Sequence, residues 1–99
     1  MAQQIEIEID SVRAPKFIES LRERSIEIEG PDEIESLDGA ALVSIIVTLT
    51  PVVAPFILEL IRTLKGTRGK IRTLETTIDL QNYSDDQLSK LIAAATGKK

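Results

Sequence analysis

The chain has 99 residues, which fits a single domain. It contains no cysteine, histidine or tryptophan, which excludes disulfides, zinc sites built on Cys or His, and catalytic sets that need a histidine. The formal net charge of −4 and the lack of stacking aromatics disfavour nucleic-acid binding. The first residues show neither the basic nor the apolar region of a signal peptide, so we expect a cytoplasmic protein.

The first two elements are predicted by clear patterns. Isoleucines alternate with acidic residues over residues 5–10, which predicts a strand with one apolar face. A helix is expected over residues 14–24, because Pro15 suits the first turn and an apolar stripe follows at helical spacing. The stripe consists of Phe17, Ile18 and Leu21.

Acidic residues dominate the next segment. Residues 25–29 alternate and predict a second short strand, which Gly30-Pro31-Asp32 breaks. An acidic loop is expected over residues 29–38. Residues 1–38 hold 11 acidic and 4 basic side chains, whereas residues 39–99 hold 5 acidic and 8 basic ones. This asymmetry favours association with a second copy or another protein, although two solvated surfaces would also explain it.

The segment over residues 39–58 is uncharged and mostly aliphatic. Twenty residues of helix match the thickness of a bilayer's hydrocarbon core, so a membrane span must be considered. Thr50-Pro51 is a typical helix start, which instead predicts two helices, over residues 38–49 and 51–65, with a break between them. Gly66 is expected to cap the second helix.

A helix that is apolar on all sides must be covered both on the side that faces the sheet and on the opposite side. One side can pack on the sheet, and the other must face a second copy, a partner or lipid. The residues predicted to make this contact are Leu42, Val43, Ile46, Val47, Val53, Phe56 and Ile57. A basic flank follows, which is typical of the cytoplasmic side of a membrane segment. It consists of Arg62, Lys65, Arg68, Lys70 and Arg72.

The C-terminal part predicts a hairpin and a helix. Alternation over residues 70–80 indicates two strands that turn near Glu75-Thr76. The last helix has a capping box made by Ser84 and Gln87. The predicted fold is therefore α+β, in the order β-α-β-α-α-β-β-α. A small mixed sheet would be covered by a long, proline-broken apolar helical segment.

Candidate chemistry is sparse. The segment Gly66-Thr67-Arg68-Gly69-Lys70 lacks the spacing of a phosphate loop, and Ile71 replaces the required Ser or Thr. Four carboxylates are expected on one sheet face, where an acid/base pair or a hard-cation site is conceivable. They are Glu6, Glu8, Glu27 and Glu29. A solvated face, with Lys70 and Arg72 as cross-strand partners, is favoured. The prediction is therefore no enzyme, no cofactor and no metal.

Several segments carry a resemblance to a known family. They are Ser20-Leu21-Arg22, Leu37-Asp38-Gly39-Ala40-Ala41-Leu42, Leu60-Ile61-Arg62-Thr63-Leu64-Lys65, Ile78-Asp79-Leu80 and Ser84-Asp85-Asp86-Gln87-Leu88. Over residues 1–99, as one domain, the chain resembles the effector-associated constant component family of bacterial conflict systems. It departs from that pattern in its middle, which is richer in Ile and Val and holds two prolines.

The resemblance implies a non-catalytic accessory protein in antiphage defence, encoded beside proteases or other effectors. Two hypotheses follow from it and from the apolar segment. In the first, the chain is an adaptor that forms homo-oligomers or binds an effector. In the second, it inserts residues 39–58 into lipid, with the basic flank at the phosphate level.

Overall fold

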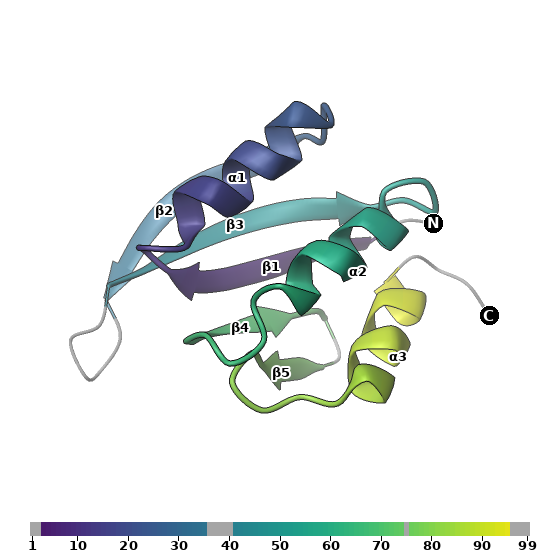
Figure 1. The fold of residues 1–99 in the computed structure, drawn as a ribbon. Coiled ribbons are helices and arrows are strands. Elements are labelled where there is room, and N and C mark those ends of the chain that lie inside the picture. Colours follow the sequence, from purple (N-terminus) through teal and green to yellow (C-terminus); the bar gives the residue numbers. More distant parts are fainter. Residues whose placement is uncertain (1–2, 36–40, 75, 96–99) are drawn as a thin grey trace.

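The computed structural model describes residues 3–35, 41–74 and 76–95. Within them the chain forms five strands and three helices (Figure 1). In chain order these are β1 (Gln3–Asp10), α1 (Ala14–Glu23), β2 (Ile28–Glu35), β3 (Ala41–Leu49), α2 (Ala54–Arg62), β4 (Gly69–Arg72), β5 (Thr77–Asp79) and α3 (Asp85–Ala95).

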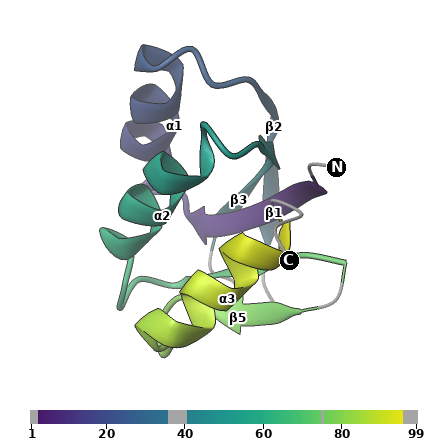
Figure 2. The same cartoon turned by 90° about the vertical axis from the view of Figure 1, so that its right-hand side faces the viewer.

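The five strands form one open sheet in the order β2-β3-β1-β4-β5. Every neighbouring pair is antiparallel, so the prediction of a mixed sheet is wrong. Strand β1 is central and pairs with β3 along its whole length, from Gln3 opposite Leu49 to Asp10 opposite Leu42. The three helices lie on one side of this sheet (Figure 2).

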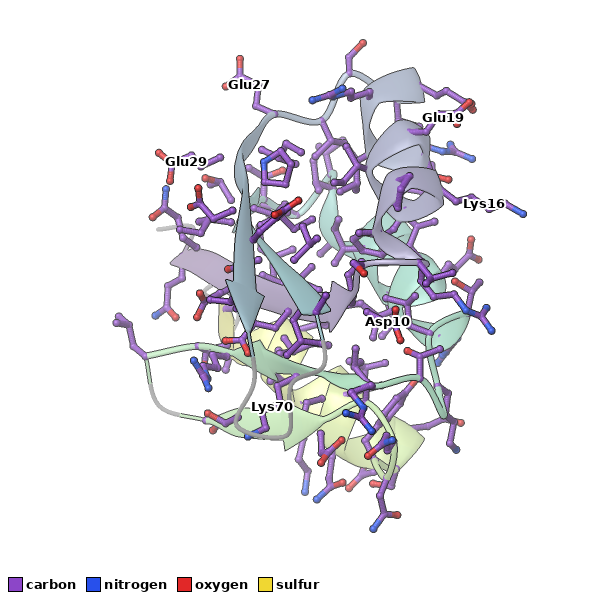
Figure 3. The ribbon with its side chains drawn as sticks, turned by 90° about the vertical axis from the view of Figure 1, so that its left-hand side faces the viewer. Asp10, Lys16, Glu19, Glu27, Glu29 and Lys70 are labelled. Atoms are coloured by element: carbon purple, nitrogen blue, oxygen red, sulfur yellow. The ribbon has the colours of Figure 1, made fainter. Side chains whose placement is uncertain are left out.

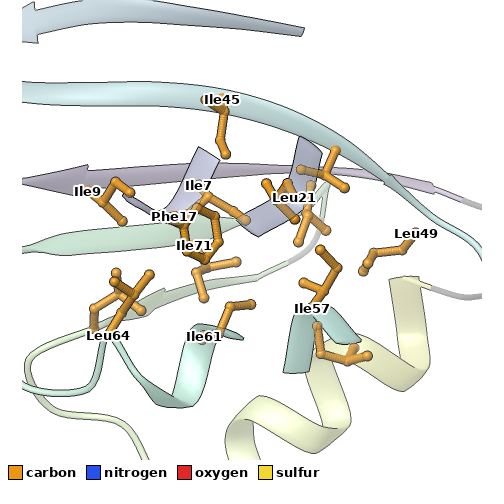
Figure 4. Packing of buried hydrophobic residues seen from close by; sticks show 14 of the residues in the cluster. Ile7, Ile9, Phe17, Leu21, Ile45, Leu49, Ile57, Ile61, Leu64 and Ile71 are labelled. Atoms are coloured by element: carbon orange, nitrogen blue, oxygen red, sulfur yellow. The ribbon is translucent and has the colours of Figure 1, made fainter. Parts of the chain in front are cut away.

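The core fills the space between the sheet and the helices (Figure 4). The predicted alternation of β1 is confirmed, since Ile5, Ile7 and Ile9 are all buried there. They meet side chains such as Leu21 of α1 and Ile57 of α2, which are fully buried as well. Burying each such side chain contributes roughly 1.5–3 kcal/mol, so this layer stabilises the fold.

The prediction of a helix over residues 38–49 is wrong for residues 41–49, which form strand β3. Residues 38–40 lie outside the described part. The segment is rich in β-branched side chains, which fit a pleated sheet better than a helix. Strand β3 also has a partner on each side, β1 and β2, so its backbone groups are paired along both edges. The expected long apolar helical segment is thus a strand followed by the short helix α2. That helix lies inside the predicted range 51–65.

The prediction of an acidic loop over residues 29–38 is also wrong as far as Glu35. Strand β2 continues through the expected break, with a cis bond between Gly30 and Pro31. Its register against β3 shifts between Glu29 and Asp32. The turn residues are therefore accommodated as an irregularity in an edge strand, where proline is tolerated. Residues 36–38 of the predicted loop lie outside the described part.

The C-terminal elements agree with the sequence patterns. Strands β4 and β5 form the predicted hairpin. The Ser84 Oγ accepts from the Gln87 N–H at 3.1 Å, and the Gln87 Oε1 accepts from the Ser84 N–H at 3.0 Å, which confirms the capping box. The role predicted for Gly66 is wrong, because α2 ends at Arg62 with Thr63 as its cap. The Gly66 N–H instead donates to the Leu80 carbonyl at 2.8 Å.

Candidate interaction surface

The sheet has a second face, turned away from the three helices, which we call the outer face. The alternation of each strand defines it, because the neighbours of its residues point into the core. Its side chains come from all five strands. They are Gln4, Glu6, Glu8 and Asp10 of β1, Glu29, Asp32 and Ile34 of β2, Leu42, Ser44, Ile46 and Thr48 of β3, Lys70 and Arg72 of β4, and Thr77 and Asp79 of β5.

An ion-pair cluster lies at the centre of the outer face. The Arg72 Nη1 is 2.7 Å from Glu8 Oε2 and 3.6 Å from Glu6 Oε1. The Ser44 Oγ donates to Glu6 Oε2 at 2.7 Å. The Glu8 side chain is only 8% exposed, whereas that of Arg72 is 45% exposed. The cluster therefore joins β3, β1 and β4, and the single charge of Arg72 offsets half of the charge of the two carboxylates.

A hollow of about 800 Å³ opens at one end of this cluster. Its lining includes the partly buried Ile46 of β3 and Arg72 of β4. Leu74, in the β4–β5 connection, stands at the rim and is 87% exposed. An exposed leucine beside a half-buried isoleucine is the kind of apolar feature that protein partners cover.

The structure separates the residues predicted to make the apolar contact. Val47 and Ile57 are fully buried in the core, so the prediction that they meet a partner is wrong. Val43 is 8% exposed and faces the helical side of the sheet. Leu42 and Ile46 lie on the outer face and are half-buried. The other two predicted residues lie on the helical side of the sheet.

Those two residues, Val53 and Phe56, are half-buried at the start of α2. The Phe56 ring already has a contact, because the Arg24 guanidinium lies 3.3 Å from its centroid. Both residues lie outside the outer face, on the opposite side of the sheet.

The predicted basic flank is also divided. Lys70 and Arg72 lie on the outer face. Arg62 is on α2 with its Nε 3.9 Å from the Asp85 Oδ1, and the Lys65 Nζ is 5.4 Å from the Tyr83 ring centroid. Arg68 is exposed in the connection between α2 and β4. These cations therefore do not form one continuous surface.

Two of the four predicted carboxylates come together. Glu6 and Glu8 share Arg72, which confirms it as a cross-strand partner. Glu29 lies two strands away on β2, and Glu27 precedes that strand. In the described ranges, no three acidic side chains are grouped closely enough to hold a metal ion.

Two further findings bear on function. Within residues 3–35, 41–74 and 76–95, every helix is too short or too polar to cross a bilayer. Comparison with protein-family models, with curated proteins and with solved structures found no match to this chain.

The sequence patterns did not indicate that Ser44 and Leu74 contribute to this surface. Ser44 lies in a segment that was predicted to be a helix, so its neighbours on adjacent strands could not be predicted. The apolar Leu74 in a predicted turn was the available signal, because turns are usually polar.

Proposed function

We propose that the chain is a non-catalytic interaction module that binds a partner protein through the outer face of its sheet. The observation that supports this is that no helix of the described residues covers this sheet face, which holds half-buried Leu42 and Ile46 and has the exposed Leu74 at its edge. Following the family resemblance, the partner is an effector of the same bacterial conflict system, and the chain acts as its adaptor.

The polar groups of the outer face support binding more than catalysis. Arg72 pairs with both Glu6 and Glu8, so these charges join β4 to β1, and the hydrogen bond from Ser44 to Glu6 joins β3 to β1. General acid–base chemistry instead needs a group within reach of a substrate proton. Glu8 is covered by its neighbours, and the hollow beside it is open and partly apolar.

Charge favours a partner with a basic contact surface. The described outer-face side chains include six carboxylates, of Glu6, Glu8, Asp10, Glu29, Asp32 and Asp79, against the cations of Lys70 and Arg72, for a net charge of −4. Two copies that met through this face would bring like charges together, which costs affinity. Effector binding is therefore favoured over self-association through the outer face.

The test is co-purification of the chain with the proteins encoded beside its gene. We expect one of them to form a stable complex that the changes Ile46→Lys and Leu74→Lys disrupt. The matched control is Val52→Lys, which adds the same charge at a residue that is 85% exposed before α2, away from the outer face. A complex that survives both outer-face changes, or that Val52→Lys weakens equally, would refute the proposal.

A second arm tests the membrane hypothesis. Size-exclusion chromatography with light scattering and liposome flotation are run on the chain alone, without detergent. A defined particle that does not float with liposomes agrees with the interaction module. Flotation that depends on the cations of Arg62, Lys65 and Arg68 would favour membrane binding instead.

A further inference from the structure

We propose that the groove between α1 and the free edge of β2 binds an extended basic segment of a partner protein, which adds a strand to the sheet. This site lies at the end of the sheet, beneath α1. The inference is independent of the outer-face proposal, because its groove is on the helical side.

The groove has an apolar floor. It encloses about 770 Å³ between α1 and β2. Ala14, Ile18 and Val43 form the floor, and each is at most 8% exposed. Pro15 and Pro31 line its sides. Figure 3 looks at this end of the molecule, with β2 in front and α1 beside it. The aliphatic stems of long side chains on an added strand would therefore find an apolar surface on the α1 side.

The backbone of β2 provides the second half of the site. Within the described residues this strand pairs with β3 alone, so its other edge has no strand beside it. Residues 32–35 pair with β3 in regular register, from Asp32 opposite Ser44 to Glu35 opposite Ala41. A regular edge presents alternating N–H and C=O groups, which an incoming strand can pair with. The irregularity at Gly30-Pro31 limits this pairing to the second half of β2.

Charge determines which strand fits. Around the groove lie the carboxylates of Glu19, Glu23 and Glu33 against the single cation of Arg22, for a net charge of −2. The edge strand of a second copy carries the same acids, so pairing between two β2 edges would place like charges opposite each other. A segment with alternating basic and aliphatic residues fits when its basic side chains face α1, because their aliphatic stems then cover the floor and their charged heads reach the three carboxylates. Its aliphatic side chains then lie on the other face of the sheet, beside Ile34.

The probe is a fluorescein-labelled peptide, Lys-Val-Lys-Val-Lys-Val-Lys, followed by fluorescence anisotropy at physiological salt. The same peptide with glutamate in place of lysine should not bind. The change Glu33→Lys should weaken binding roughly 5- to 30-fold, since it removes one attraction and adds one repulsion. The matched control is Glu59→Lys, which makes the same charge change on the exposed side of α2, away from the groove. It should change the affinity less than about 2-fold, because salt screens distant charges.

Strand addition has its own signature, which distinguishes it from charge attraction. Bound peptide should slow amide hydrogen exchange in residues 32–35, because an added strand protects edge amides. Peptide binding should also persist in the variant Ile46→Lys, which disrupts only the outer face. The two proposals can therefore be told apart, because loss of outer-face binding leaves peptide binding in the groove intact, and loss of peptide binding leaves outer-face binding intact.

Three results would overturn the inference. One is no binding of the basic peptide at about 1 mM, the weakest affinity expected of a specific site. Another is equal weakening by Glu33→Lys and Glu59→Lys, which would show attraction to net charge alone. The last is slowed exchange on the outer face or at β5 without any in residues 32–35.

Discussion

Replacing Arg72 by methionine should destabilise the protein, because it leaves the buried carboxylate of Glu8 without its cation. The Glu8 side chain is 8% exposed and has its 2.7 Å contact with Arg72. Removing one partner of a fully buried ion pair costs about 3–5 kcal/mol. Arg72 is itself 45% exposed, so water already screens this pair, and we expect a smaller loss of about 2 kcal/mol. Methionine retains most of the arginine stem, so lost packing contributes little.

Urea unfolding followed by circular dichroism measures this loss. For a domain of this size, about 2 kcal/mol also lowers Tm by roughly 8–16 °C. The control is Lys70→Met, which removes a cation from the same face of β4 at an exposed position. The double variant Glu8→Met/Arg72→Met should recover most of the stability, since apolar side chains often replace a buried ion pair without cost. If Arg72→Met is no worse than Lys70→Met, or if the double variant is the least stable, the reasoning about Glu8 is wrong.

Three other predictions test the core and the strands. Burial raises the pKa of Tyr83 above its usual 10.0, so the folded protein holds the phenol proton more tightly than the unfolded chain. The free energy of unfolding should therefore fall as the pH rises past about 10. Tyr83→Phe should flatten that dependence when urea unfolding is measured across pH. In β3, Val47→Asp should prevent folding, whereas Thr48→Asp, on the opposite face, should change the unfolding free energy by less than about 1 kcal/mol. Gly69→Ala should destabilise strongly in thermal unfolding, because its Cβ would collide with the Glu8 carbonyl oxygen; a Tm close to wild type would contradict that crowding.

Local sequence patterns were sufficient to predict an element where its structure depends on residues that are close in sequence. The alternation of residues 5–10 predicts β1, and the capping box at Ser84 predicts the start of α3. Both signals depend on neighbours within a few residues. The partners of Glu6 and Glu8 were foreseen as well, because alternation placed Arg72 on the same face.

Pairing between distant segments was not predictable in the same way. Whether residues 29–35 form a loop or an edge strand depends on β3, which pairs with them across a shifted register. The Gly30-Pro31 step has the composition of a turn, and only the neighbouring strand makes it an irregularity inside β2. The groove beneath α1 arises from the same distant pairing, so no pattern within one segment could indicate it.

The uncharged segment shows why an apolar run is ambiguous. Read as a helix, residues 41–49 are apolar on every side and demand two coverings. As a central strand, the same residues divide by alternation: Ile45 and its inward neighbours enter the core, and only Leu42 and Ile46 remain half-buried outside. Fewer apolar side chains are therefore left outside the core than the sequence implied, and those of β3 lie on the outer face. An outer face that kept only polar side chains would need no partner. This one keeps Ile46 beside the exposed Leu74 at one end, and Ile34 opposite Leu42 at the other, which is why the proposed partner is placed there.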